Sequence, residues 1–281
     1  HRDLHSFPTR RSSDLLSERL PGDGDARELL AQIHAEKQRK IAAGEIKKEK
    51  PLPPVSADEI PFAIPENWQW VRLGEIGNIQ TGNTPSKSEK ENYGTDFPFF
   101  KPADLSQGNN IVKPSEFLSF IGRTKARIVP RDSLLINGIG NVGNLGIVRI
   151  EGAFNQQMHS LTPYNGVMLE LAYLFLQSSY LQKMMLSDTS QTTIPILNKN
   201  NFSMICFPLP PLAEQQRIVE KLNRLLNEID SLKAQEQALL TAQNAFPKKL
   251  RAAILQAAIQ GELNERTNEN ARDLLAAIQA E

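Results

Sequence analysis

Residues 66–210 contain short apolar runs that are separated by turns rich in glycine and asparagine. Runs of this length with β-branched residues are typical of strands. The strands that they predict are 71–73, 111–112, 117–118, 134–136, 146–150 and 203–207. Over residues 169–186 the apolar positions instead recur every three to four residues, which predicts one helix. We therefore expect an α+β domain of mixed strands and helices over 66–210, a size that folds alone.

A different pattern begins at residue 211, where apolar residues alternate at spacings of four and three. This heptad spacing predicts a long coiled-coil-forming helix over 211–262, whose apolar stripe needs a partner helix. The stripe, called the seam below, consists of Ile218, Leu222, Leu225, Ile229, Leu232 and Leu239. Pro247 predicts a break, after which a helical pattern continues to Gly261 as its C-cap. The alternative is a helix that packs on its own domain, but the pattern is longer than such a domain covers.

The two ends of the chain carry a sequence repeat. Residues 26–36 read ARELLAQIHAE and residues 271–281 read ARDLLAAIQAE, with eight of eleven positions identical. We interpret 16–46 as the tail of a preceding helical region and 263–281 as its repeat. Residues 47–65, rich in lysine and proline, predict an extended linker. Residues 1–15 resemble a translated sequencing adaptor, so we leave them out of the fold prediction.

Composition narrows the classes of function. The 281 residues carry 32 basic and 32 acidic side chains, so binding of nucleic acid through bulk positive charge is disfavoured. A local basic patch is still present, since Arg123, Lys125, Arg127 and Arg131 lie close together in the sequence. The single cysteine, Cys206, excludes disulfides within the chain and thiolate zinc sites, and we expect it to be buried and inert. Because neither a membrane span nor a signal peptide is present, we predict a cytoplasmic protein with no membrane partner.

Gly138, Gly140 and Gly143 have the G-x-G-x-x-G spacing of dinucleotide-binding loops. That motif needs a helix directly after the glycines, because the free N–H groups of the helix hold the pyrophosphate. Residues 145–150 are instead rich in β-branched side chains and predict another strand. We therefore interpret the glycines as a turn between two strands and keep a nucleotide-binding enzyme as the less favoured alternative.

Motifs for catalysis are absent from the sequence. It contains no G-x-x-x-x-G-K-[ST] loop, no serine nucleophile elbow and no Asn-Pro-Pro-aromatic segment of the kind that holds a flipped base. Beyond the first five residues the only histidines are His34 and His159, and no pair has the spacing of metal ligands. We predict that the chain is not an enzyme and that it holds no metal ion.

The helical pattern opens with LPPLAEQQRIV at 209–219. This string closely resembles the boundary between recognition domain and conserved helix in the specificity (S) subunits of type I restriction–modification enzymes. Four further segments resemble the same family in the same order, namely WQWVRLGEI at 68–76, TGNTP at 81–85, IGNVG at 139–143 and AAIQGEL at 257–263. The resemblance covers 16–281, and the repeat agrees with it, because these subunits contain two copies of recognition domain plus helix. Only one recognition domain is present here, which implies the C-terminal half of a subunit or a half-subunit that dimerises.

The resemblance also implies a function and a set of partners. The chain would read one half of a split, asymmetric site in double-stranded DNA, while the helices set the distance between the halves. Its protein partners would be the modification (methyltransferase) subunits, the restriction/translocase subunit and, through antiparallel helices, the missing N-terminal half or a second copy. S-adenosylmethionine, ATP and Mg would be bound by those subunits, and this chain would bind no cofactor.

Readout of DNA needs amide and hydroxyl groups that reach base edges, and cations that contact phosphates. The candidates for base contacts are Gln80, Thr81, Asn83, Thr84, Asn109, Gln156, Gln157, Ser190, Gln191 and Thr192. The candidates for phosphate contacts are Lys87, Lys101, Arg123, Lys125, Arg127 and Lys199. Gln156 and Gln157 are favoured, because paired amides beside a strand end are hard to explain by packing. A coiled-coil adaptor without DNA binding is the main alternative, although it leaves the polar loops unexplained.

Overall fold

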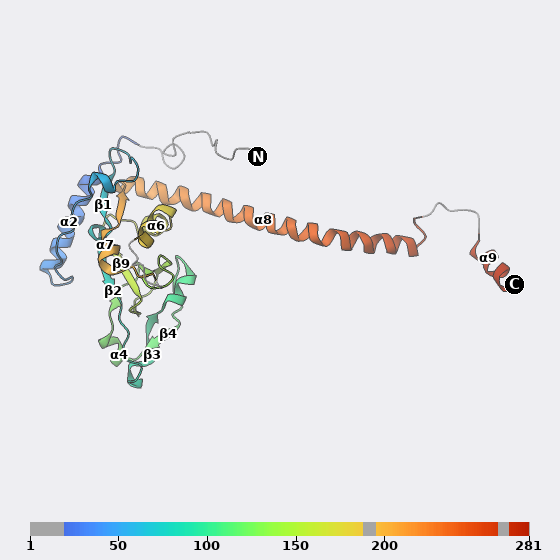
Figure 1. Ribbon diagram of the computed structural model, residues 1–281, viewed down its shortest axis with the longest axis horizontal. Coiled ribbons are helices and arrows are strands. Elements are labelled where there is room, and N and C mark those ends of the chain that lie inside the picture. The colour runs from blue at the N-terminus through green and yellow to red at the C-terminus, as the bar shows by residue number, and fades with distance from the viewer. Residues whose placement is uncertain (1–19, 188–194, 264–269, 281) are drawn as a thin grey trace. The chain divides into compact units, whose positions relative to one another are not determined.

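The computed structural model describes residues 20–187, 195–263 and 270–280 (Figure 1). The chain forms two compact units that divide after Leu222. The first unit mixes strands and helices, and a single helix, α8 (Leu212–Ile259), begins in it and continues into the second. This confirms the predicted α+β domain followed by a long helix.

The first unit begins with helix α2 (Ala26–Ala42). Asp25 caps this helix, because its carboxylate accepts a hydrogen bond from the backbone N–H of Arg27 at 2.7 Å. Ala26, Leu29 and Ile33 are buried in the same core as the strands. The segment boundaries assigned from the sequence stay predictions, but α2 packs as an integral part of this unit.

A short sheet joins the two ends of the 66–210 region. Strand β1 (Gln69–Arg72) pairs antiparallel with β10 (Cys206–Leu209), so that Val71 lies opposite Phe207. The one-turn helix α3 (Leu73–Ile76) follows β1 directly and leads into the main sheet. Residues far apart in the sequence therefore enter and leave the domain side by side.

Two four-stranded sheets lie between these ends. One has antiparallel strands in the order β2 (Gly77–Thr81), β9 (Met158–Pro163), β6 (Ser133–Asn137) and β7 (Leu145–Val148). The other has the order β4 (Glu116–Leu118), β3 (Tyr93–Phe100), β8 (Gly152–Phe154) and β5 (Ile128–Val129), with only β3 and β8 parallel. The shorter helices of the described chain are α4 (Phe120–Lys125), α5 (Leu169–Leu176), α6 (Ser179–Ser187), α7 (Lys199–Met204) and α9 (Ala271–Ala280). Three 3₁₀ turns complete the description: η1 (Ala57–Glu59), η2 (Lys90–Asn92) and η3 (Pro102–Gln107).

Several predicted element boundaries are wrong for local reasons. The single helix expected over 169–186 is two helices, because the N–H of Gln177 closes α5 and the hydroxyl of Ser178 accepts from Leu181 N as α6 begins. The strand expected over 203–207 starts only at Cys206, since α7 extends to Met204. Residues 111–112 form no strand and contribute one bridge, from Ile111 to Val148.

The break expected at Pro247 is absent, and α8 continues through this residue. Proline removes one backbone donor, but the helix formers on both sides keep the remaining hydrogen bonds. The predicted C-cap is confirmed at Gly261, whose φ is +72°. The N–H groups of Gly261 and Glu262 close the helix on the carbonyls of Ala258 and Ala257, which is a Schellman motif.

The proline-rich segment 47–65 is irregular apart from η1, but it is fixed to the domain by Arg72. Arg72 is 2 % exposed, and its guanidinium has several partners in the segment. It donates to the carbonyl oxygens of Pro53 (3.0 Å) and Pro54 (3.1 Å) and forms an ion pair with Glu59 at 2.7 Å. The hydrogen bonds from Arg72 lower the pKa of Glu59 to about 2. The segment is therefore docked on the domain.

Candidate nucleic-acid interface

Two segments that carry predicted base contacts run side by side at the end of β2. The N–H groups of Gly82 and Asn83 donate to the carbonyls of Met158 (3.0 Å) and Phe154 (3.1 Å). A Cβ atom at Gly82 would lie 2.3 Å from the carbonyl oxygens of Phe154 and Asn155, so only glycine permits this approach. The hydroxyl of Thr84 donates to the side-chain oxygen of Gln156 across the gap. The fold therefore brings the 80–84 and 155–157 candidates together.

Arg127 joins these segments from a third part of the chain. Its guanidinium donates to the backbone carbonyl of Thr81, and its own N–H donates to the side-chain oxygen of Asn83 at 2.6 Å. We call the resulting group the polar cluster, which consists of Gln80, Thr81, Thr84, Arg127, Gln156 and Gln157. The side-chain amides of Gln80 and Gln157 make no hydrogen bond within the described chain, so they are available to a ligand.

Asn83 has a different role in the structure from the other candidates. Its amide donates to the carbonyl of Lys125 at 2.7 Å, and its oxygen accepts from Arg127. Both ends of the side chain are therefore used to hold the backbone that carries Arg127. A base contact by Asn83 stays a prediction, but what the structure shows for it is the positioning of that backbone.

His159 was not among the candidates, yet it fixes the hydroxyl of Thr81. Its Nε2 lies 2.7 Å from the carbonyl oxygen of Leu197, which can only accept, so Nε2 carries the proton. Nδ1 is then an acceptor, and Thr81 Oγ1, 2.9 Å away, donates to it. Burial lowers the pKa of His159, which favours this neutral form. The oxygen of Thr81 is left with acceptor capacity only.

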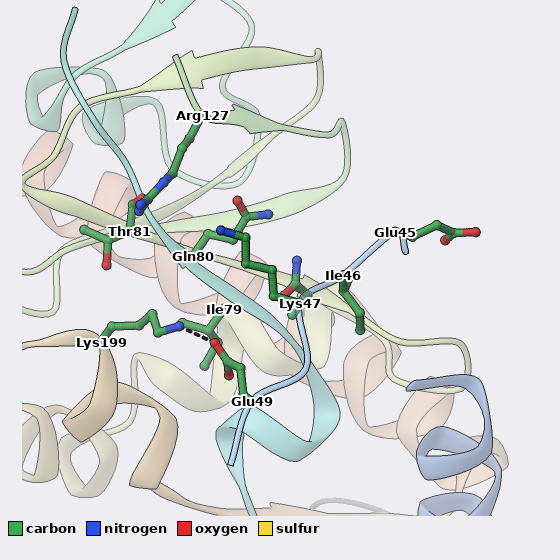
Figure 2. A pocket seen from close by; sticks show the side chains of 10 residues that line it. Glu45, Ile46, Lys47, Glu49, Ile79, Gln80, Thr81, Arg127 and Lys199 are labelled. Atoms are coloured by element: carbon green, nitrogen blue, oxygen red, sulfur yellow. Dashed lines mark hydrogen bonds and ion pairs between the residues drawn. The ribbon is translucent and has the colours of Figure 1, made fainter. Parts of the chain in front are cut away.

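A pocket of about 270 Å³ adjoins the polar cluster (Figure 2). Gln80, Thr81 and Arg127 line it, together with Lys47 and Lys199. Lys199 forms an ion pair with Glu49, a residue of the docked 47–65 segment. The lining therefore offers amide, hydroxyl and cationic groups, as a phosphate backbone or a base edge requires.

The predicted phosphate contacts differ in their present partners. Five of the cations pair with carboxylates: Lys87 and Lys101 with Glu116 (3.7 and 2.6 Å), Arg123 with Glu151 (3.3 Å), Lys125 with Glu89 (2.6 Å), and Lys199 with Glu49. Arg127 forms no ion pair with any described residue. Exposed ion pairs contribute little to stability, so the paired cations can exchange partners at low cost. Arg127 needs no exchange at all.

The remaining candidates lie elsewhere. Asn109 is exposed in a separate loop, where its carbonyl accepts from Arg149 at 3.1 Å. Ser190, Gln191 and Thr192 lie outside the described residues. The structure therefore places the candidates of 80–84 and 155–157 side by side, whereas Asn109 lies in a different loop.

The glycine segment is a turn between strands, as expected, and the strand β7 follows it where a dinucleotide site needs a helix. Gly140 and Gly143 have φ of +77° and +87°, a conformation that favours glycine. A Cβ atom at Gly138 would lie 2.8 Å from His159 Nε2, so this glycine makes room for the contact between His159 and Leu197.

Other kinds of site find little support in the described residues. No group of three or more His, Cys, Asp or Glu among them is placed to hold a metal ion. None of the helices in the described ranges combines the length and apolar character needed to cross a membrane. Cys206 is fully buried, and burial raises the pKa of its thiol, as expected for an inert cysteine.

The start of α8 is anchored to the first unit. Ile218 and Val219 are buried against Leu171. Glu214 accepts from the indole N–H of Trp68 at 2.8 Å, and Gln215 accepts from Met168 N at 2.8 Å. The alternative of a helix packed on its own domain thus holds for these first turns.

The rest of the seam is uncovered. Leu222 and Leu225 are partly buried, and Ile229, Leu232 and Leu239 are exposed, with Leu232 at 63 %. An exposed apolar stripe of this regularity is a surface for another helix. The chain thus combines a domain that presents polar loops with a helix that presents an apolar stripe.

Comparison with known proteins identifies the family. Residues 65–242 match the family model described as "Type I restriction modification DNA specificity domain", and the chain belongs to this family. The EcoAI specificity subunit of Escherichia coli is 28 % identical over 225 residues, which are 76 % of this chain and 37 % of that protein. The EcoEI specificity subunit of Escherichia coli is 29 % identical over 260 residues, 87 % of this chain and 42 % of the relative.

A solved structure agrees with the sequence comparison. The HsdS subunit from Thermoanaerobacter tengcongensis superposes with a TM-score of 0.54 at 26 % identity, over 85 % of this chain and 54 % of that one. The chain therefore spans about half of this subunit and less than half of the two Escherichia coli relatives.

Proposed function

We propose that this chain recognises one half of a bipartite site in double-stranded DNA, as part of a type I restriction–modification system. The polar cluster carries this proposal, because it combines free amides, an acceptor-only hydroxyl and an arginine without a carboxylate partner on one part of the domain. Amides bind base edges in two directions, and arginine contacts phosphates or guanine.

Within the cluster we assign the base contacts to Gln80, Thr84, Gln156 and Gln157. The neighbouring cations Arg127, Lys125 and Lys199 would fix the register of the domain on the phosphates. Phosphate binding by the two lysines requires them to leave Glu89 and Glu49, and the field of the DNA supplies the driving force.

We propose further that catalysis belongs to partner subunits. The modification subunits would bind S-adenosylmethionine and the restriction subunit ATP and Mg, while this chain holds them on the DNA in the cytoplasm. Family membership supports this division of labour.

The test of recognition is a selection from random duplexes with the chain bound to its modification subunits. We expect enrichment of one short sequence element, followed by tighter binding of that duplex than of scrambled DNA in fluorescence anisotropy. A coiled-coil adaptor, which the exposed seam alone would favour, predicts no enrichment and no binding of the domain to any duplex.

A further inference from the structure

Helix α9 repeats the buried face of α2. The buried residues of α2 are Ala26, Leu29, Ile33 and Glu36. Their counterparts in the C-terminal repeat are Ala271, Leu274, Ile278 and Glu281, so every one of the four is unchanged. The positions of the repeat that differ fall at Glu28, Gln32 and His34, all of which are exposed in α2. The repeat thus preserves every buried position and varies only at exposed ones, of which His34 lies 3.3 Å from the carboxylate of Glu75 in α3.

The two helices also begin in the same way. Asp25 accepts from the backbone N–H of Arg27 at 2.7 Å, and Asn270 accepts from that of Arg272 at 3.1 Å. Each cap therefore satisfies the same free donor at the equivalent position. This is independent of the apolar pattern, and it means that α9 has the same register as α2.

The surface that receives α2 lies on α3 and the turn between β9 and α5. A Cβ atom at Gly166 would lie 2.5 Å from a methyl group of Leu29, so the absence of a side chain at Gly166 makes room for that leucine. The backbone N–H of Asn165 donates to the carboxylate of Glu36 at 2.7 Å. Lys37 donates to the carbonyl of Gly74 at 3.0 Å. We call this surface the α2 seat.

The matching face of α9 is uncovered. Leu274 is 67 % exposed and Ile278 is 63 % exposed, although both belong to one apolar face of the helix. An exposed apolar face of this kind is a surface for binding a partner. The α2 seat of this chain is already filled by α2 itself, so the seat that α9 matches belongs to another domain.

We propose that α9 binds the α2 seat of a second recognition domain of the same family, one whose seat is not filled by the helix that precedes it. The proposal rests on the proposed function in one respect, that such an assembly contains a second recognition domain. The length of the relatives agrees, since this chain spans only 37–42 % of the two Escherichia coli subunits.

The first experiment makes the seat available without changing it. A protease site is inserted between the exposed residues Lys50 and Pro51 of the full chain, so that cleavage leaves α2 held by its contacts alone. A fluorescent peptide of residues 25–36 then exchanges into the seat and is displaced by unlabelled competitors. We expect a 270–281 peptide to displace it within about tenfold of the concentration that unlabelled 25–36 requires.

The matched control is the 270–281 peptide with Leu274→Ser and Ile278→Ser. We expect its displacing concentration to be at least about a hundredfold higher than that of the unaltered 270–281 peptide. Equal potency of this control, or no displacement by the unaltered 270–281 peptide where 25–36 displaces, overturns the proposal.

The second experiment uses the uncut chain. The substitutions Asp25→Asn, Glu28→Asp, Gln32→Ala and His34→Gln place the 270–281 sequence in the position of α2. We expect a melting temperature within about 3 °C of the original chain, whereas adding Leu29→Ser lowers it by more than about 5 °C. A drop of more than about 5 °C in the variant with the four substitutions alone would show that the 270–281 sequence does not fit the α2 seat. Neither experiment measures DNA binding, so a negative result would not contradict the proposed function. Conversely, a failure to bind DNA would not contradict the match between α9 and the α2 seat.

Discussion

Arg127 differs from the other predicted phosphate contacts, because it has no carboxylate to give up. We expect Arg127→Ala to weaken binding to every duplex by a similar factor and to lower the slope of log K against log salt by about one. Anisotropy titrations at several salt concentrations measure both quantities.

Arg123→Ala is the matched control for this variant, since Arg123 is also an exposed arginine of the same segment but pairs with Glu151. We expect Arg123→Ala to change the affinity and the salt slope less than Arg127→Ala does. A larger loss for Arg123→Ala than for Arg127→Ala would mean that the absence of an ion pair does not identify the phosphate contact.

Gln157 is the candidate whose free amide makes the sharpest prediction about base readout. We expect Gln157→Ala to cost roughly 1–3 kcal/mol at particular base pairs of the selected site and little on random DNA. Binding of a panel of single-base variants of the site locates the affected position. Equal losses on the selected and scrambled duplexes would remove Gln157 from the readout residues.

His159 links the interface to pH. Its pKa is lowered in the folded chain, so the unfolded state binds a proton more readily than the folded state. The free energy of unfolding is therefore highest above the ordinary histidine pKa. As pH falls below that value, His159 lowers the free energy of unfolding by at most about 1.4 kcal/mol per pH unit. Urea unfolding at pH 7.5, 6.5 and 5.5 measures the decline.

We expect His159→Gln to reduce that dependence on pH, because glutamine does not titrate. His34→Gln is measured in parallel, because it removes the other histidine of the described residues, which lies 3.3 Å from the carboxylate of Glu75. A pH dependence that is unchanged in His159→Gln would exclude His159 as its source.

At this scale the sequence identified candidate residue types but not their states. Gln156, Gln157 and Thr84 could be selected as polar loop residues, and the fold does bring them together. The role of His159 could not be found, because it depends on the register that places His159 opposite Thr81 across two strands far apart in the chain. The same holds for Arg127, whose lack of an ion pair follows from where the nearby carboxylates fall.

Among the elements, α8 shows which features of a helix the spacing of apolar residues predicts and which it does not. The heptad spacing predicted a long helix, and the helix is present. Proline within a helix removes one backbone donor and therefore predicts a break at Pro247, but α8 continues through this residue. The division between α5 and α6 was missed for the opposite reason, since one side-chain cap interrupts an otherwise continuous apolar pattern.

The exposed seam of α8 predicts association through this element. We expect the chain to self-associate as concentration rises, and Leu232→Glu to weaken that association about tenfold or more, because burial of a leucine contributes roughly 1.5–3 kcal/mol. Sedimentation velocity measures the assembly, and the melting temperature of the domain should not change. Ala234→Glu adds the same charge away from the seam and should have little effect, whereas a monomer at all concentrations would mean that the seam is covered within the chain.

For the whole molecule, the proposed division of labour predicts a silent subunit. We expect no transfer of a methyl group from S-adenosylmethionine to DNA by the purified chain, and site-specific transfer after the modification subunits are added. Incorporation of tritiated methyl groups measures both conditions. Transfer of methyl groups by the chain alone would contradict the assignment of catalysis to partners.

The pairing of β1 with β10 has a consequence for inheritance. Because the polypeptide enters and leaves the domain on adjacent strands, recombination at those two points would exchange everything between them as a cassette. The anchor of α8 lies outside the exchanged stretch, apart from its contacts with Met168 and with Leu171 of α5. If the domain reads DNA as proposed, its sequence preference would change in a single genetic event, while the sequence of α8 is kept.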